Sequence, residues 1–335
     1  MSLKVSIVAG GAGFVGCNLL PLLASEERHL LILDNLCRGR LDYLNPVRNI
    51  AGDRVHFLDV DLSDLRATLQ AFEFSQRLGV TDEVWHLAAN SDIPAGVLDP
   101  KIDLRDTFMT TLSLLEAMRS YRIGTLHFAS SSAIYGDHGG IPLHESIGPL
   151  LPISNYGAMK LASEALISAA CESYLNRANL FRFPNVVGAP ATHGVILDFT
   201  NKLKEDPTRL DVLGDGTQQK AYLHVSDLVA AMMHVRNSGG LPKVFPINIG
   251  PVDDGVTVRF IAETVTKRVS PRATICFGTG NKGWVGDVPK FQYSVDRLSQ
   301  TGWSPSYSSE EAVRYAIDQI AIQEGFGTKV DKCND

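Results

Sequence analysis

A chain of 335 residues with 44% apolar and 20% charged side chains is long enough for one large or two small packed domains. Its net charge of -6, without a long basic run, argues against nucleic acid as a partner, and no apolar run approaches the roughly 18 residues of a membrane span. Five scattered cysteines without a Cys-x-x-Cys pair argue against a disulfide framework or a zinc site. The start has no signal-peptide pattern, so we expect a cytoplasmic protein that binds no metal, nucleic acid or membrane.

The first motif joins an apolar run, residues 5–9, to a helical pattern through three glycines, Gly10, Gly13 and Gly16. Strand, glycine turn and helix in this order place a helix N-terminus under a pyrophosphate, where backbone amides and the helix dipole favour negative charge. Gly10 would allow the tight turn, Gly13 the approach of the phosphates, and Gly16 the close packing of helix and strand.

The second expected strand, residues 29–33, ends in Asp34, 18 residues after Gly16. This spacing is close to the offset of about 20 residues at which an acid binds the ribose hydroxyls of NAD. The alternative is an ordinary tight turn followed by a strand-terminal Asp. A carboxylate here would repel the 2′-phosphate of NADP, so NAD is favoured, while Arg38 and Arg40 just beyond leave NADP open.

Strands and helices then alternate along the first half of the chain. This order predicts an α/β fold, a doubly wound parallel sheet of Rossmann type with helices on both faces, and ligands at the carboxyl ends of its strands. Further strands are expected at 55–58, 83–87, 126–129 and 180–183, and helices at 63–74, 102–121 and 155–176. The strand ends carry Gly10, Asp34, Asp59, Ala88, Ser131 and Asn185.

The second half is less regular and is punctuated by glycine and proline, which predicts a smaller α/β substrate-binding domain. Two apolar runs, 222–225 and 245–249, are expected to return to the sheet. We therefore expect an NAD-binding domain of residues 1–184 with 221–250, a second domain of residues 185–220 and 251–325, and a tail of residues 326–335.

Tyr156 and Lys160 open the expected helix 155–176 and lie four residues apart, on one face. A nearby ammonium favours the phenolate and lowers the pKa of a tyrosine from its usual value of about 10. Such a phenol can take a proton from a sugar hydroxyl, and Ser131 can hydrogen-bond the same oxygen. The three side chains suit hydride transfer between an alcohol carbon and a nicotinamide; the alternative is a surface Tyr and Lys on an amphipathic helix.

Further motifs follow in one order between residues 4 and 320. They are Leu33-Asp34-Asn35-Leu36, Asp59-x-Asp61, His86-Leu87-Ala88-Ala89, Ser130-Ser131 with Tyr135-Gly136, Arg182-x-x-Asn185-Val186, Gly214-Asp215-Gly216-x-Gln218, His224-Val225-x-Asp227, Asn248-Ile249-Gly250 and Gly286-Asp287. With these motifs the chain resembles the extended short-chain dehydrogenases/reductases of the NAD-dependent nucleotide-sugar epimerase/dehydratase type.

The resemblance implies that the second domain, residues 185–220 and 251–325, binds the nucleotide sugar, and it implies roles for single residues. Tyr156 would be the base, Lys160 would bind the nicotinamide ribose and lower the tyrosine pKa, and Ser131 would bridge to the substrate. Asp34 and Asn35 would hold the adenosine ribose. The implied cofactor-binding residues are Gly10, Gly13, Phe14, Val15, Gly16, Asp34, Asn35, Asp59, Val60, Asp61, Leu87, Ala88, Ala89, Ser130, Tyr156, Lys160 and Pro184; the implied substrate-binding residues are Ser131, Ser132, Asn185, Lys220, Trp284 and Asp287.

The absence of an acidic pair after the fifth expected strand argues against the dehydratases of this family. Dehydratases of this type carry Thr-Asp-Glu where this chain has Ser131-Ser132-Ala133, so the acid and base of 4,6-dehydration are missing. The serine-rich motif is similar to that of 4-epimerases, in which NAD takes hydride from C4, the 4-keto sugar rotates, and hydride returns to the other face. The alternatives are a 4-keto-sugar reductase or sugar dehydrogenase on the same scaffold, and a non-catalytic NAD-binding regulator, which typically lacks the Tyr/Lys pair.

Some positions depart from the family pattern. Lys220-Ala221 replace the usual Arg-Asp, and Trp284 replaces an arginine; both arginines normally clamp the diphosphate. Thr107 stands for the usual Asn and Val187 for the usual Tyr. Because lysine is a point charge that cannot form a bidentate fork, we expect an unusual substrate pocket.

The resemblance also implies a homodimer through helices 102–121 and 155–176, with packing inside one subunit as the alternative. His193 lies in the presumed substrate region and is expected to be a loop residue, with contact to the sugar as the alternative. His86, His127 and His224 follow or lie within apolar strands and are expected to be core or turn residues rather than ligands.

Overall fold

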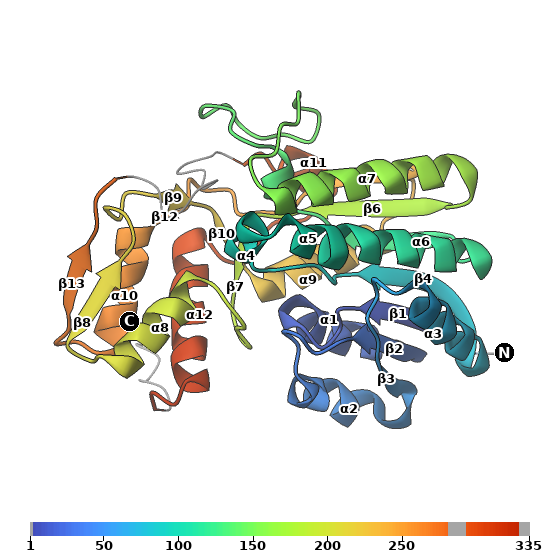
Figure 1. The fold of residues 1–335 in the computed structure, drawn as a ribbon, viewed down its shortest axis with the longest axis horizontal. Coiled ribbons are helices and arrows are strands. Elements are labelled where there is room, and N and C mark those ends of the chain that lie inside the picture. The colour runs from blue at the N-terminus through green and yellow to red at the C-terminus, as the bar shows by residue number, and fades with distance from the viewer. Residues whose placement is uncertain (1–2, 281–292, 328–335) are drawn as a thin grey trace.

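Seven parallel strands form a central sheet in the order β11-β6-β5-β4-β1-β2-β3. The computed structural model describes residues 3–280 and 293–327 (Figure 1). The strands are β1 (Lys4–Ala9), β2 (Arg28–Asp34), β3 (Val55–Asp59), β4 (Val80–His86), β5 (Thr125–Ala129), β6 (Arg177–Arg182) and β11 (Val244–Asn248). All six strands expected in the first half are present, and the predicted Rossmann-type sheet is confirmed. The chain order reverses at β1, between β2 and β4, where such sheets bind their ligands.

The two faces of the sheet carry separate hydrophobic clusters. Val8 and Ile32 point into one cluster, and their neighbours Ile7 and Leu31 point into the other. Because both faces are covered, β1 is buried from Val5 onward, as the continuous apolar run in its sequence predicts.

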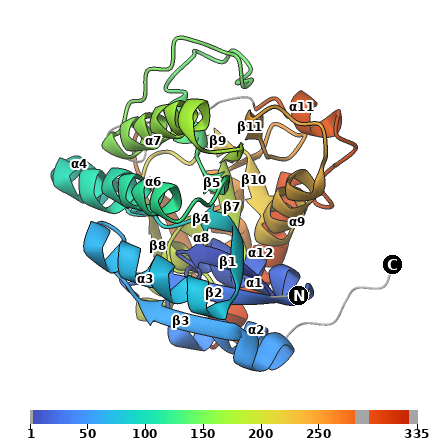
Figure 2. The same cartoon turned by 90° about the vertical axis from the view of Figure 1, so that its right-hand side faces the viewer.

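Helices cover both faces (Figure 2). One face packs against α1 (Phe14–Ala24), α2 (Asn45–Ala51) and α9 (Val225–Asn237). The other packs against α3 (Leu65–Leu78), α6 (Thr110–Ser120) and α7 (Asn155–Ser173). Shorter elements are η1 (Leu41–Leu44), η2 (Gly52–Arg54), α4 (Ile93–Leu98), η4 (Ser132–Ile134) and α11 (Asp296–Ser299).

The expected helix 102–121 is interrupted. It consists of α5 (Pro100–Asp103), a π-helical segment η3 (Leu104–Met109) and then α6. The carbonyl oxygen of Thr107 accepts hydrogen bonds from the hydroxyls of Thr110 at 3.0 Å and Thr111 at 3.1 Å. Side-chain hydroxyls that bond to a helix carbonyl compete with the regular backbone ladder, and π-segments often occur at functional sites.

The remaining elements form a smaller body beside the sheet (Figure 1). Its helices α8 (Val195–Glu205), α10 (Val258–Val269) and α12 (Ser309–Gln323) share one hydrophobic cluster. Its strands pair as β7 (Asn185–Val187) with β10 (Tyr222–His224), β8 (Arg209–Val212) with β13 (Thr274–Phe277), and β9 (Gln219–Lys220) with β12 (Val256–Thr257).

Of the two apolar runs expected to return to the central sheet, one does and the other does not. The run 245–249 joins the central sheet, since β11 pairs with β6. The run 222–225 does not, because β10 pairs with β7 and is held by α12, where the Ser309 hydroxyl accepts a hydrogen bond from the Tyr222 backbone at 3.1 Å. The domain boundaries stay a prediction. In the described part of the chain, no helix is long and apolar enough to cross a membrane.

Candidate active site

The glycine turn is shaped by contacts that exclude side chains. Gly10 has a φ of +80°, and a Cβ built on it would lie 2.6 Å from the backbone nitrogen of Ala88. A Cβ on Gly16 would lie 2.5 Å from the carbonyl oxygen of Gly10, so α1 starts in direct contact with the turn. Gly13 is the N-cap of α1, and within the described residues no side chain caps this helix. The turn and the uncapped helix end fit the phosphates of a dinucleotide.

Asp34 is buried at the end of β2 and is fixed by two backbone donors. Its Oδ2 accepts from the nitrogen of Ala12 at 3.0 Å, and its Oδ1 accepts from the nitrogen of Leu36 at 2.9 Å. Burial raises the pKa of Asp34, the charge of Asp59 raises it further, and the two hydrogen bonds oppose this rise. The carboxylate thus stands at the edge of the glycine turn, where a ribose acceptor is needed.

The two arginines that left NADP open are both paired with carboxylates. Nη2 of Arg38 lies 2.8 Å from Oδ2 of Asp92. Arg40 forms a bidentate pair with Asp42, with both contacts at 2.9 Å. A 2′-phosphate would have to compete with these carboxylates, which favours NAD over NADP.

The other predicted cofactor residues lie at the carboxyl ends of the parallel strands. Leu87, Ala88 and Ala89 are partly buried just after β4, and the nitrogen of Leu87 donates to Ala9 at 2.9 Å. Asp61 is exposed after β3 and accepts from the backbone and hydroxyl of Ser63. At the same edge the structure places Phe14 and Val15 (partly buried), Asn35 and Asp59 (exposed), and Val60, Ser130 and Pro184 (buried).

The three predicted catalytic side chains come together where β5 meets α7. The Ser131 hydroxyl lies near enough to the Tyr156 phenol to lower its pKa, and Nζ of Lys160 lies 5.8 Å from the Tyr156 ring centroid. Nζ of Lys160 also donates to the carbonyl oxygen of Ala129 at 2.6 Å. Ser154 caps α7 by accepting from Gly157 at 3.1 Å, which sets where the helix begins and so orients Tyr156.

The pKa of Tyr156 differs from the expectation. Burial raises it to about 12, the Ser131 hydrogen bond lowers it and the charge of Asp103 raises it. Burial also lowers the pKa of Lys160 to about 7, against the charge of Glu164. The net shift of the Tyr156 pKa is therefore upward rather than downward, because burial outweighs the groups that favour the phenolate.

Asp103 is a buried carboxylate near Tyr156 to which no motif in the sequence points. It is fully buried, its Oδ1 accepts from Asn90 at 2.8 Å, and its Oδ2 has no hydrogen-bond partner among the residues described. Oδ2 packs against Gly96, whose carbonyl accepts from Asn155 at 2.8 Å, next to Tyr156. The available signal was its spacing of four residues from Thr107, which places both on one helix face.

The predicted substrate residues are only partly placed. The nitrogen of Ser132 donates to the carbonyl of Phe183 at 3.1 Å, so the segment after β5 lies beside the segment that leads to Asn185. Asn185 is exposed at the start of β7, and Lys220 is partly buried in β9. Trp284 and Asp287 lie outside the described residues.

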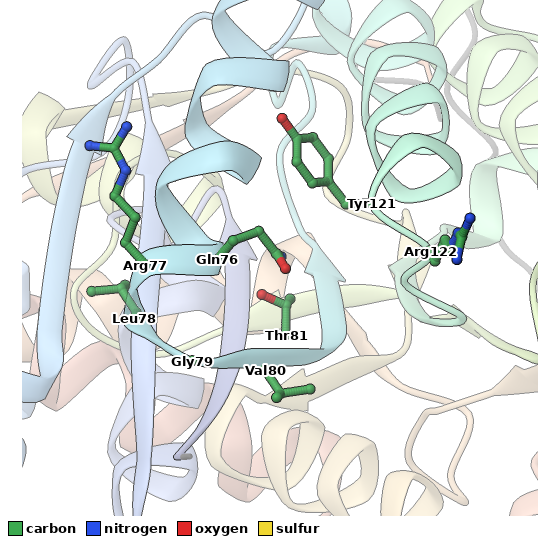
Figure 3. Close-up of a pocket in the computed structure, with 8 residues that line it drawn as sticks. All are labelled: Gln76, Arg77, Leu78, Gly79, Val80, Thr81, Tyr121 and Arg122. Carbon is green, nitrogen blue, oxygen red and sulfur yellow. The ribbon is translucent and has the colours of Figure 1, made fainter.

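A separate pocket lies at the amino-terminal ends of the strands β4 and β5 (Figure 3). Its lining includes Val80 and Thr81, where β4 begins, and Tyr121 and Arg122, just before β5. All the predicted site residues on these strands lie at the carboxyl ends, so this pocket is not the candidate active site.

Comparison with known proteins agrees with this geometry. Residues 6–250 match the family described as "NAD dependent epimerase/dehydratase family". A solved UDP-galactose 4-epimerase is 32% identical with a TM-score of 0.82, over 95% of this chain and 99% of that chain. The UDP-glucose 4-epimerase of Thermus thermophilus, solved with NAD, is 28% identical with a TM-score of 0.80, over 94% and 98% of the two chains.

Similarity in sequence extends over the same length. The UDP-glucose 4-epimerase of Azospirillum brasilense is 28% identical over 332 residues, which cover 92% of this chain and 89% of that protein. The family resemblance and the NAD dependence expected from the motifs are thus confirmed. The chain belongs to the NAD-dependent epimerase/dehydratase family of enzymes.

Proposed function

We propose that this enzyme is a nucleotide-diphosphate-sugar 4-epimerase that oxidises C4 transiently and reduces it again from the other face. The observation that carries the proposal is the meeting of Ser131, Tyr156 and Lys160 at the end of β5, with Ser132 and Ala133 where a dehydratase needs acids. The relatives named above are UDP-sugar 4-epimerases, so we propose a UDP-sugar as the first substrate to test.

The residues divide the work as follows. Asp34 and the glycine turn would hold the dinucleotide, which when bound accepts the C4 hydride and returns it. Tyr156 would take the proton of the C4 hydroxyl and give it back, and Ser131 would hold that oxygen by a hydrogen bond. Lys160 in its ammonium form would favour the phenolate. The keto sugar must rotate between the two hydride transfers, so the pocket must accept the sugar ring in two orientations.

We also propose that the enzyme forms a homodimer through α7 and the segment 102–121, which runs from α5 through η3 to α6. Leu104 in η3 is 46% exposed, and the small residues Ala165 and Ala169 are exposed along α7. An exposed stripe of small and apolar residues allows two helices to approach closely. Light scattering should give twice the mass of the chain, and Ala169→Glu should give the monomer.

An NMR assay of the purified protein tests the reaction. The enzyme is mixed with UDP-, GDP-, CDP- and dTDP-sugars without added cofactor, and the anomeric and C4 proton signals are followed. A C4 epimer establishes the epimerase and its nucleotide together. Turnover only after addition of NAD or NAD(P)H would assign a dehydrogenase or a reductase instead. No turnover in either condition would indicate a substrate outside this panel or a non-catalytic regulator.

A further inference from the structure

Three consecutive residues at the end of β5 are each tied to the same face of α7. The carbonyl oxygen of Ala129 accepts from Nζ of Lys160 at 2.6 Å. The hydroxyl of Ser130 donates to Oε1 of Glu164 at 2.5 Å. The third contact joins Ser131 to Tyr156. Tyr156, Lys160 and Glu164 are spaced by four residues, so all three lie on the face of α7 that meets the end of β5.

Glu164 also joins α7 to the next strand. Its carboxylate receives a bidentate pair from Arg182, the last residue of β6, with Nε to Oε1 at 2.9 Å and Nη2 to Oε2 at 2.6 Å. Both side chains are about 95% buried. Nη1 of Arg182 donates to the phenol oxygen of Tyr135 at 3.1 Å, and that phenol donates to Oδ1 of Asn248 at 2.6 Å. The ends of β5, β6 and β11 are thereby fixed relative to α7.

Few charged or titratable side chains surround the carboxylate of Glu164 and its partners in the described residues. Within the described residues, Glu164 faces Arg182 from β6 and Lys160 from its own helix. Tyr135, just after η4, accepts from the Arg182 guanidinium, and so does the carbonyl of Glu145. Tyr293 donates to the carbonyl oxygen of Arg182. Lys160 in turn faces His86 from β4, and Tyr156 faces Asp103 from α5. Glu164 is the carboxylate whose charge acts on Lys160.

We propose, on the basis of the reaction proposed above, that Glu164 is a positioning residue of the active site: it locks Ser131, Tyr156 and Lys160 in register and supplies the negative charge that faces Lys160. The charge of Glu164 raises the pKa of Lys160, which burial lowers. Without that charge, Lys160 would lose its proton at lower pH, and the phenolate of Tyr156 would lose the neighbouring ammonium.

Glu164→Gln tests the charge with little change of shape. The kcat should fall by about 10- to 100-fold with KM little changed, because displacement of a reacting group by about 1 Å can cost that much. The acidic limb of the kcat profile should move to higher pH. The matched control is Glu172→Gln, an exposed position on the same helix, which should leave kcat and its pH profile unchanged.

Glu164→Asp separates the effect of the negative charge from the effect of side-chain length. It also replaces the glutamine variant as the test if that variant does not fold. It keeps the carboxylate but shortens the arm, so kcat should fall while the acidic limb stays in place. A Glu164→Gln enzyme with the wild-type pH profile, or a loss of kcat that matches its loss of folded protein, would overturn the proposal. So would a Glu164→Asp enzyme in which the acidic limb moves.

A titration without substrate separates this inference from the proposed function. The phenol of Tyr156 is titrated by ultraviolet difference between each protein and its Tyr156→Phe counterpart. A higher phenol pKa in Glu164→Gln than in the wild type supports the inference even if no nucleotide sugar turns over. An unchanged phenol pKa rejects it even if the protein proves to be a 4-epimerase.

Discussion

Oδ2 of Asp34 accepts a hydrogen bond of 3.0 Å from the backbone nitrogen of Ala12, which ties the end of β2 to the glycine turn after β1. Oδ1 accepts a second bond of 2.9 Å, from Leu36, which has a φ of +56°. One carboxylate therefore fixes both loops that border the expected adenosine site. The same oxygens have lone pairs left for ribose hydroxyls.

Asp34→Asn should weaken NAD binding and reduce the preference for NAD over NADP. An amide has one oxygen acceptor and turns a donor towards one of the two backbone N–H groups. Loss of a hydrogen bond to a charged group costs about 1.5–3 kcal/mol. Calorimetric titration with both dinucleotides measures the effect, and Asp53→Asn at an exposed position serves as the control. An unchanged ratio of the two affinities would remove Asp34 from the cofactor site.

Tyr156→Phe should lower turnover by about 10²- to 10⁴-fold, the usual contribution of a general acid or base. NAD should stay bound, because only the phenol oxygen is removed. The control is Tyr174→Phe just beyond α7, where the hydroxyl donates to the carbonyl of Leu115 at 3.0 Å, away from the site. Rates from the NMR assay and the NAD content of the purified proteins give both readouts. Wild-type turnover in Tyr156→Phe would require another base.

The parts of this site that the sequence predicted are those set by local pattern. Gly10 and Asp34 follow from the order of strand, turn and helix, and Tyr156 with Lys160 from a spacing of four residues. Asp103 and Glu164 were not found, because their roles depend on which residue lies opposite in the folded chain. The predicted downward shift of the Tyr156 pKa is wrong, because the spacing of four residues predicts the neighbouring lysine but not the burial of both groups.

Asp103→Asn should lower the pKa of Tyr156, because the charge of Asp103 raises it. The acidic limb of the kcat profile should therefore move to lower pH, opposite to the shift expected for Glu164→Gln. The limb is located by measurement of kcat from neutral pH up to the most alkaline pH at which the protein stays folded. A limb that stays at the wild-type pH would mean that Asp103 does not face the phenol electrostatically.

The same substitution should stabilise the fold at neutral pH. Burial raises the pKa of Asp103 above its usual 3.8, so the unfolded chain releases the proton first, and an ionised Asp103 costs stability above that pH. An asparagine removes this cost, and the gain should disappear below about pH 4, where the carboxyl is protonated in both states. Urea unfolding at pH 7 and at about pH 3 provides the comparison, with Asp53→Asn at an exposed position as the control.

The last prediction concerns Glu83, which is buried in the middle of β4. Its Oε1 lies 2.5 Å from Nη1 of Arg28, and its Oε2 lies 2.8 Å from Nε of Arg236 and 3.3 Å from Nε2 of His127. Glu83→Gln would leave two buried guanidinium groups without this carboxylate, which should cost about 3–5 kcal/mol of unfolding free energy. Glu73→Gln, in an exposed pair with Arg77, should cost only about 0.5 kcal/mol or less.

The pH dependence of this effect has a defined sign. Burial alone would raise the pKa of Glu83, but His127, Arg236 and Arg28 hold it far below its usual 4.5. A carboxyl whose folded pKa is depressed stabilises the fold above its unfolded pKa and loses that contribution as pH falls below it. Burial lowers the pKa of His127 from 6.5, so uptake of a proton by the unfolded chain also weakens the fold below that pH. Wild-type unfolding free energy should thus be flat at pH 7–8, decline below 6.5 and fall steeply below 4.5, whereas Glu83→Gln should lack the steep part. Equal slopes for the two proteins below pH 4.5 would show that Glu83 is not held ionised by these partners.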